Sequence, residues 1–253
     1  MPWHVAYERI KPYLFRIHTE GGFGTGFLFA FNKDHSLAAI ATAAHVIEHE
    51  HSWSKPIKIG HYETRDIVLF STQERVIWLD LKRDAATILI RSDKFNLPPS
   101  ALPIMDPTKY KKVGVEVGWV GFPGICAHEL CFFSGKISTF LLAENSYLID
   151  GVAINGVSGG PVFDELKDST PEIVGVVSAY MPNRATQEPS PGLLMALDVT
   201  SHQEHIQRIK SFDDAKAKEK ETQQAIDKPR DAKECEQPAP PDVKPAGPSS
   251  ANK

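Results

Sequence analysis

The sequence predicts an all-β protein made of two consecutive halves, followed by a short helix and a polar tail. Along the 253-residue chain, short segments rich in Val, Ile, Phe and Leu alternate with Gly, Asn, Asp and Ser, as strands alternate with turns. No long helical periodicity interrupts either half. Residues 95–112 carry four prolines and no clear periodicity, which is typical of a linker. Two β-rich halves of similar size indicate two packed barrels or a large sandwich.

Candidate strands fill both halves. In the first half, about residues 10–94, they are residues 14–18, 24–31, 37–42, 67–70, 75–80 and 86–90. In the second half, residues 113–200, they are residues 115–120, 129–133, 136–142, 147–150, 173–179 and 193–199. A glycine-rich segment, residues 155–161, leads through Pro161 into one more strand at Val162 and Phe163.

A helix and a tail are expected after the second half. Ser201 followed by Glu204 has the pattern of a capping box, with a hydroxyl at the N-cap and a carboxylate three residues later. Apolar side chains then recur at helical spacing, which predicts a closing helix over residues 201–212 with a buried stripe of Ile206, Ile209 and Phe212. Residues 213–253 contain no aromatic residue and six prolines, all from residue 229 onward. They predict a polar, Pro-rich, disordered tail, although residues 216–224 have helical propensity.

Charge and hydropathy argue against several classes of function. The net charge is −4 and no run of Lys and Arg is present, so neither nucleic acid nor an anionic membrane is an expected partner. No apolar stretch approaches the length of a membrane span. The N-terminus lacks the basic start and continuous apolar region of a signal peptide.

The three cysteines, Cys126, Cys131 and Cys235, cannot all pair with one another. The spacing of Cys126 and Cys131 fits a small disulfide loop or half of a zinc site, but no second Cys/His pair with metal-ligand spacing accompanies it. Free thiols are the favoured interpretation, and they are typical of a reducing compartment. We therefore expect a cytoplasmic protein.

The segment Asn-Gly-Val-Ser-Gly-Gly-Pro, residues 155–161, is the strongest candidate for chemistry. Its glycines permit a tight turn around Ser158, because glycine tolerates dihedral angles closed to other residues. Such a turn can direct the backbone N–H groups of Gly156 and Ser158 to one point, where they would stabilise an oxyanion. The alternative is a glycine-rich hairpin with an incidental serine.

A histidine and an aspartate upstream complete the set that nucleophilic acyl transfer requires. His45 follows an apolar strand among small residues, and Asp84 opens another apolar strand. Each has an ordinary alternative, because His45 could be a core histidine bonded to a carbonyl and Asp84 a turn residue. Together with Ser158 they supply a nucleophile, a base and an orienting carboxylate. Asp80 and Asp66 are rival carboxylates.

These motifs together resemble the chymotrypsin-like (trypsin-fold) serine peptidases, particularly the bacterial trypsin-like and HtrA-type branch. The resemblance spans about residues 14–209 and follows the family's order of His, Asp and Ser. Only Asp84 fits the family's Asp-x-Ala pattern. The segments that carry the resemblance are Gly24-Thr25-Gly26-Phe27-Leu28, Ala41-Thr42-Ala43-Ala44-His45, Asp84-Ala85-Ala86, Trp119-Val120-Gly121-Phe122-Pro123 and Gly156-Val157-Ser158-Gly159-Gly160-Pro161.

The resemblance implies a fold and roles for individual residues. It implies two perpendicular antiparallel β-barrels within residues 1–212, with the active site in the cleft between them. His45 would be the general base, Asp84 would orient it, Ser158 would attack, and Gly156 with Ser158 would form the oxyanion hole. Val157 departs from the family pattern, because trypsin-type zymogens carry an aspartate there that pairs with a freed N-terminus. The residues after 212 are too few and too polar for the PDZ domain that HtrA proteins usually carry.

The expected activity is that of a serine endopeptidase acting on polypeptides through an acyl-enzyme, without metal or organic cofactor. The alternatives are a peptidase that processes only itself or one partner, and a silent binding protein on a peptidase fold. The tail could recruit a protein partner. The family's specificity pocket would be formed here by Val152, Ser178, Tyr180 and Gly192. Because Val152 offers no counter-charge and Tyr180 could narrow the entrance, we expect cleavage after small or medium aliphatic residues.

Overall fold

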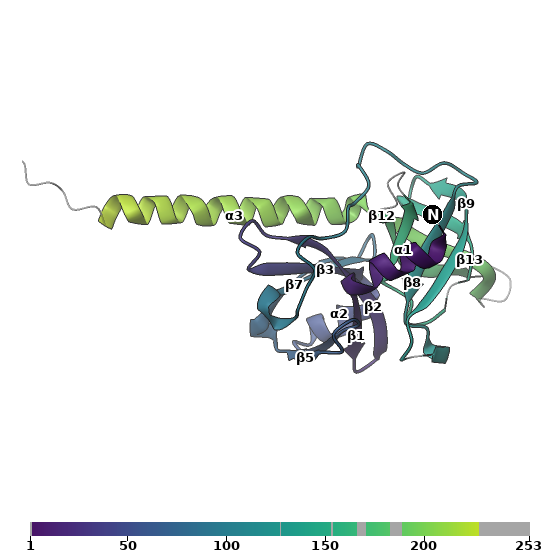
Figure 1. Cartoon of the computed structure of the whole chain (residues 1–253), viewed down its shortest axis with the longest axis horizontal. Coiled ribbons are helices and arrows are strands. Elements are labelled where there is room, and N and C mark those ends of the chain that lie inside the picture. The colour runs from purple at the N-terminus through teal and green to yellow at the C-terminus, as the bar shows by residue number, and fades with distance from the viewer. Residues whose placement is uncertain (1, 127, 153, 166–170, 183–188, 228–253) are drawn as a thin grey trace, which may run out of the picture. The chain divides into compact units, whose positions relative to one another are not determined.

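The computed structural model of the chain describes residues 2–126, 128–152, 154–165, 171–182 and 189–227 (Figure 1). Residues Met1–Asp214 form one compact unit, and the remainder of the last helix, from Ala215, belongs to a second. Within the first unit, a curled β-sheet from the first half of the chain lies beside a β-barrel from the second half. The site discussed below is built at their junction.

The N-terminal sheet has seven antiparallel strands in the order β5-β4-β1-β2-β3-β7-β6. Its strands are β1 (Leu14–Thr19), β2 (Gly22–Phe31), β3 (Leu37–Ala43), β4 (Ile57–His61), β5 (Ile67–Phe70), β6 (Arg75–Asp80) and β7 (Ala85–Arg91). The helices of this half are α1 (Trp3–Ile10), η1 (Lys11–Tyr13), α2 (Ala44–Ser52), η2 (Thr72–Glu74) and η3 (Ser92–Lys94). Helix α2 follows β3 without a break.

The C-terminal half is a closed antiparallel barrel in the order β10-β13-β12-β11-β8-β9. Its strands are β8 (Glu116–Gly121), β9 (Cys131–Leu141), β10 (Ser146–Asp150), β11 (Pro161–Glu165), β12 (Pro171–Pro182) and β13 (Pro189–Asp198). A short helix η4 (Gly124–Cys126) lies between β8 and β9, and helix α3 (Thr200–Asp227) follows β13.

The predicted all-β class with a C-terminal helix is confirmed, and the barrel of the second half is closed. The first half is a curled sheet in which β5 and β6 are the edge strands. Two predicted segments, 129–133 and 136–142, are parts of the single strand β9. Gly135 lies where those two segments were separated, and a Cβ there would lie 2.0 Å from the Asp150 carbonyl oxygen, so this glycine serves a close approach of two strands. Helices α1 and α2 and strand β4 were not anticipated.

The predicted cap of the last helix is wrong. Helix α3 begins at Thr200, whose N–H donates to Asp198 Oδ1 at 2.8 Å, while the Ser201 hydroxyl is buried with no partner among the described residues. Of the predicted stripe, Ile209 is buried, but the Phe212 side chain is 67% exposed. The helix also continues to Asp227, past the expected boundary at residue 212. Residues 228–253, the rest of the predicted tail, lie outside the described residues.

One hydrophobic core is shared by both halves. It joins Phe27 and Phe29 of the N-terminal sheet to Trp119, Val162 and other barrel residues. A second core, including Phe15, lies within the N-terminal sheet. Because the first core spans both halves, burial of its side chains holds the sheet and the barrel together.

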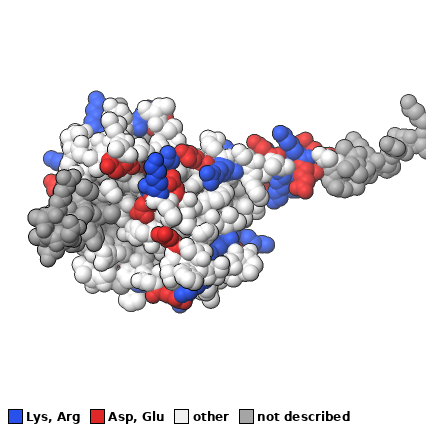
Figure 2. Space-filling view, turned by 180° about the vertical axis from the view of Figure 1, so that it is seen from behind, with Lys and Arg blue, Asp and Glu red and all other residues white. Residues whose placement is uncertain are grey.

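The surface carries charges of both signs. On the face shown in Figure 2, Lys and Arg are interspersed with Asp and Glu, and uncharged surface separates them. Among the described helices, none combines the length and the apolar character that crossing a lipid bilayer requires.

Candidate active site

His45 and Asp84 are brought together at the ends of two paired strands. Strand β3 ends at Ala43, so His45 lies in the first turn of α2, while Asp84 lies just before β7, the strand that pairs with β3. The Ala44 N–H donates to the Asp84 carbonyl oxygen at 2.9 Å, and the His45 N–H donates to Asp84 Oδ1 at 2.9 Å. These backbone bonds fix the aspartate beside the imidazole.

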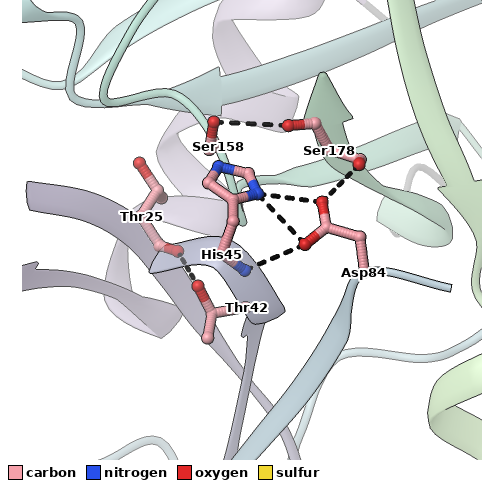
Figure 3. A network of polar contacts seen from close by, with 6 residues as sticks. All are labelled: Thr25, Thr42, His45, Asp84, Ser158 and Ser178. Atoms are coloured by element: carbon pink, nitrogen blue, oxygen red, sulfur yellow. Dashed lines mark hydrogen bonds and ion pairs between the residues drawn. The ribbon is translucent and has the colours of Figure 1, made fainter. Parts of the chain in front are cut away.

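The two side chains form a close pair (Figure 3). His45 Nδ1 lies 2.9 Å from Asp84 Oδ2 and 3.1 Å from Oδ1. Because a carboxylate only accepts hydrogen bonds, Nδ1 must carry the proton, and in the neutral ring Nε2 is left as the basic nitrogen. That second ring nitrogen lies on the side of the imidazole that faces Ser158 (Figure 3).

Asp84 is held as a carboxylate although it is largely buried. Burial alone would raise its pKa, but the hydrogen bond and charge of His45 and a hydrogen bond from the Ser178 hydroxyl hold the pKa of Asp84 below its usual value. Its backbone has a φ of 52°, a left-handed conformation that aspartate tolerates better than most residues. The rival carboxylates are elsewhere. Asp80 accepts the Arg83 N–H at 3.1 Å, and Asp66 is exposed beside Thr64.

The serine loop depends on glycines at two positive-φ positions. Gly156 has a φ of +94°, and a Cβ there would lie 2.3 Å from the Phe122 carbonyl oxygen. Gly159 has a φ of +83°, and a Cβ there would lie 2.2 Å from the carbonyl oxygen of Thr25. Any other residue would strain the backbone and clash at either position, so the loop requires both glycines.

The orientation of one peptide in this loop is fixed by its neighbour. The Gly124 N–H donates to the Asn155 carbonyl oxygen at 2.7 Å. In a trans peptide the C=O and the next N–H point in opposite directions, so the Gly156 N–H is turned away from Gly124. Gly156 and Ser158 also line one cavity together with His45.

The Ser158 hydroxyl has a different partner from the one expected. It donates to the Ser178 carbonyl oxygen at 3.4 Å, and no bond among the described residues joins it to His45 (Figure 3). The structure therefore brings His45 and Asp84 into direct contact and places Ser158 next to them without that last bond. Catalytic hydrogen bonds are often long or misaligned before substrate binds.

Thr25 is the site residue that the sequence did not single out. Its N–H donates to the Ser158 carbonyl oxygen at 2.8 Å, and its hydroxyl donates to the Gly156 carbonyl oxygen at 2.8 Å. The same hydroxyl accepts the Phe122 N–H at 3.1 Å, and the Thr42 hydroxyl donates to the Thr25 carbonyl oxygen at 2.7 Å. Thr25 thus ties the serine loop of the barrel to the N-terminal sheet. Its place in a Gly-Thr-Gly segment was visible, but its partners are distant in sequence.

Comparison with known proteins places the chain in a family. A profile of the trypsin-like peptidase domain matches residues 24–176, a segment that includes His45, Asp84 and Ser158. The chain belongs to the trypsin-like peptidase family. The predicted relationship to trypsin-fold serine peptidases is therefore confirmed. No curated protein sequence matches the chain.

Solved structures share the fold of this trypsin-like peptidase domain. The serine endoprotease from Yersinia pestis aligns at a TM-score of 0.61 and 18% identity, over 83% of this chain and 66% of that one. This chain thus covers just under two thirds of the Yersinia chain. The inactive form of Rv3671c from M. tuberculosis aligns at 0.56 and 18% identity, over 83% of this chain and 93% of that one. Deg5 aligns at a TM-score of 0.57 and 18% identity, over 78% of this chain and 88% of that one.

The predicted specificity pocket of the peptidase domain is only partly described. The Val152 side chain is 50% exposed, and Ser178 is buried with its hydroxyl on Asp84. Gly192 has a φ of +85° with open space where a Cβ would be, and its carbonyl oxygen accepts the Gly151 N–H at 2.8 Å. The backbone of Tyr180 pairs with Leu194 in the barrel, but its side chain lies outside the described part of the structure.

Two buried histidines of α3 lie behind the strands that carry the site in this peptidase domain. His202 Nε2 lies 3.2 Å from the Ala86 carbonyl oxygen, and His205 Nδ1 lies 2.6 Å from the Thr87 hydroxyl. Burial is the main cause that lowers the pKa of each histidine to about 4, and in His202 the proximity of His205 contributes to the same shift. Both histidines are therefore neutral at pH 7. Cys126 and Cys131 are free thiols, and Cys235 lies outside the described residues.

Proposed function

We propose that the chain is a serine endopeptidase that uses His45, Asp84 and Ser158 as a catalytic triad. The observation that carries the proposal is the His45–Asp84 pair, in which Nδ1 contacts a carboxylate at 2.9 Å and Nε2 faces Ser158 (Figure 3). Membership in the trypsin-like peptidase family supports the same chemistry. Asp84 holds the imidazole in the tautomer that can accept a proton and stabilises the imidazolium that then forms.

The proposed reaction proceeds in two stages. The Ser158 hydroxyl rotates from the Ser178 carbonyl toward His45, gives its proton to Nε2, and Oγ attacks the substrate carbonyl carbon. The N–H groups of Gly156 and Ser158 stabilise the resulting oxyanion. The imidazolium then protonates the leaving amine, which leaves an ester on Ser158. Water, activated by His45, hydrolyses that ester and restores the hydroxyl.

The acyl side of the site, which is the part that binds the substrate residue before the cut, is proposed to favour small or medium aliphatic residues. Val152 is apolar and half-exposed, so it offers no partner to an ammonium or guanidinium group. Gly192 leaves one wall open. A peptide-library profile should show Ala, Val or Leu before the cut, and Tyr180→Gly should widen the tolerance toward Phe. Dominance of Lys, Arg or Glu at that position would contradict this assignment.

Covalent labelling tests the triad directly. A fluorophosphonate probe should label the full chain, and Ser158→Ala should abolish labelling while Ser211→Ala, an exposed serine on α3, should not. His45→Ala and Asp84→Ala should each suppress labelling without unfolding the protein. A folded wild-type protein that stays unlabelled would instead support the alternative of a binding protein on a peptidase fold. A proteome-wide cleavage assay would distinguish general proteolysis from processing of one partner.

A further inference from the structure

A cavity of about 360 Å³ opens beside Ser158 on the side of His45. Its walls are the turn between β1 and β2, the start of β2 with Phe23, the first turns of α2, and the serine loop with Gly156. We call it the leaving-group cavity. It is not lined by the described residues assigned to the acyl side, which are Val152, Ser178 and Gly192.

The position of His45 determines which part of a substrate would enter this cavity. In the proposed reaction His45 donates a proton to the leaving amine, so the chain after the cut must pass the imidazole. The leaving-group cavity is lined by His45, Ser158 and Gly156 and, five positions after His45 in α2, by Glu50. The first residues after the scissile bond are therefore the part of the substrate that it would hold.

Glu50 gives the leaving-group cavity a negative charge. Apart from histidines, it is the one ionisable side chain among the described residues that line the cavity, and it is only 1% exposed. The Glu20 N–H donates to Glu50 Oε1 at 2.9 Å, and His49 Nδ1 lies 3.4 Å from the same oxygen. Among the described residues both contacts are to Oε1, so Oε2 is the oxygen that remains for an incoming donor.

Among the described residues, Arg75 and Lys55 are basic residues near Glu50 whose side chains have other direct partners. Arg75 is attracted by Glu50, but its guanidinium donates to the carbonyl oxygens of Phe70 and Lys55. The Lys55 ammonium pairs with the Glu20 carboxylate. A carboxylate taken out of water without a directly bonded cation is costly, so a cation supplied by a ligand would be favoured there.

We propose that Glu50 selects substrates with Lys or Arg at the first or second position after the cut. This specificity rests on the peptidase function proposed above. Glu50 lies five positions after His45 in α2, which is about 7.5 Å along a helix axis. A Lys or Arg side chain can cover this span with its methylenes against Val46 and Phe23, which also line the cavity, and its charge at Glu50.

Matched peptides test this specificity. Three internally quenched peptides share one sequence and differ only after the cut, where they carry Lys, norleucine or Glu. For the wild type, kcat/KM should be about tenfold to a hundredfold higher with Lys than with norleucine. This factor corresponds to the free energy that a hydrogen bond to a charged group contributes. The Glu peptide should be the poorest. Equal rates with Lys and norleucine would overturn the proposal without any variant.

Variants of one helix separate charge recognition from a structural role. Glu50→Gln should bring the Lys-to-norleucine ratio close to one, whereas Glu48→Gln, an exposed glutamate on α2, should preserve the ratio. Glu50→Asp keeps the charge and should retain part of the preference. A purely structural Glu50 would instead lower all three rates by the same factor, and a full preference in a folded Glu50→Gln protein would refute the assignment.

Fluorophosphonate labelling, run in parallel, separates the two levels of the proposal. Labelled protein that cuts the three peptides equally would refute the Glu50 specificity and leave the peptidase function standing. Protein that is neither labelled nor active on any of the three peptides would refute both.

Discussion

Replacing Thr25 by valine is expected to weaken both the fold and the proposed chemistry. The Thr25 side chain is fully buried, and its hydroxyl is bonded to the Gly156 carbonyl oxygen and the Phe122 N–H at once. Valine has nearly the same shape but can make neither bond, so two buried backbone groups lose their partner. The backbone bond from the Thr25 N–H to Ser158 is retained.

The size of the effect follows from those two groups. An unpaired buried polar group costs about 1–3 kcal/mol, so the two groups left by Thr25→Val should lower the free energy of unfolding by roughly 2–6 kcal/mol. For a protein of this size, that corresponds to a fall in Tm of roughly 4–24 °C. Loss of one well-placed oxyanion donor costs about a hundredfold to a thousandfold in kcat. Because the Gly156 N–H would be less firmly positioned but still present, we expect kcat to fall by about tenfold to a hundredfold.

Urea unfolding followed by tryptophan fluorescence measures the first effect, and hydrolysis of a chromogenic substrate measures the second. Thr25→Ser keeps the hydroxyl and should lie close to the wild type in kcat. Thr108→Val removes an exposed hydroxyl bonded to Asp106 and controls for the substitution itself. Unchanged stability and kcat in Thr25→Val would show that the serine loop does not depend on this hydroxyl.

Three further changes have defined outcomes. Asp84→Asn should lower kcat by about four orders of magnitude, as in well-studied triads, while Asp80→Asn should not; the reverse result would disprove the assignment. For His202 and His205, the folded pKa of about 4 lies below the unfolded value of 6.5, so their contribution to stability is complete above pH 6.5 and is lost as the pH falls toward 4. Unfolding free energies should drop on the order of 3 kcal/mol per histidine over that window, and a flat profile would contradict this. Truncation after residue 214 should leave Tm nearly unchanged, because residues 215–222 are exposed, whereas Asp213→Ala should lower it through the lost bond to the Lys33 N–H.

The class of the fold could be predicted from the sequence because the patterns that indicate it are local. Alternating apolar segments and turn residues predicted the β-rich halves, and the order of His45, Asp84 and Ser158 pointed to one site. Strand β9 was predicted as two segments separated at Ser134 and Gly135, and only the neighbouring strand shows that Gly135 permits a close approach within one continuous strand. The cap of α3 was misplaced because a capping-box pattern does not reveal that the Ser201 hydroxyl faces a packed interior.

The details of the site depend on contacts between distant segments, which composition and periodicity cannot show. Thr25 meets Gly156 across 131 residues of sequence, and Ser178 meets Asp84 across 94. Glu50 gave no signal either, because a glutamate in a charged helix is ordinarily exposed. Its burial follows from the turn after β1, whose Glu20 N–H it binds.

The bonds of Thr25 also bear on how the protein folds. The nucleophile loop belongs to the barrel, but its carbonyl groups at Gly156 and Ser158 are held by a residue of the N-terminal sheet. A chain in which only one half has formed lacks these bonds and the shared core around Phe27 and Trp119. Such an intermediate should therefore be catalytically inactive, and peptidase activity should arise only when the two halves pack together. Newly made chains would be protected from one another until that moment.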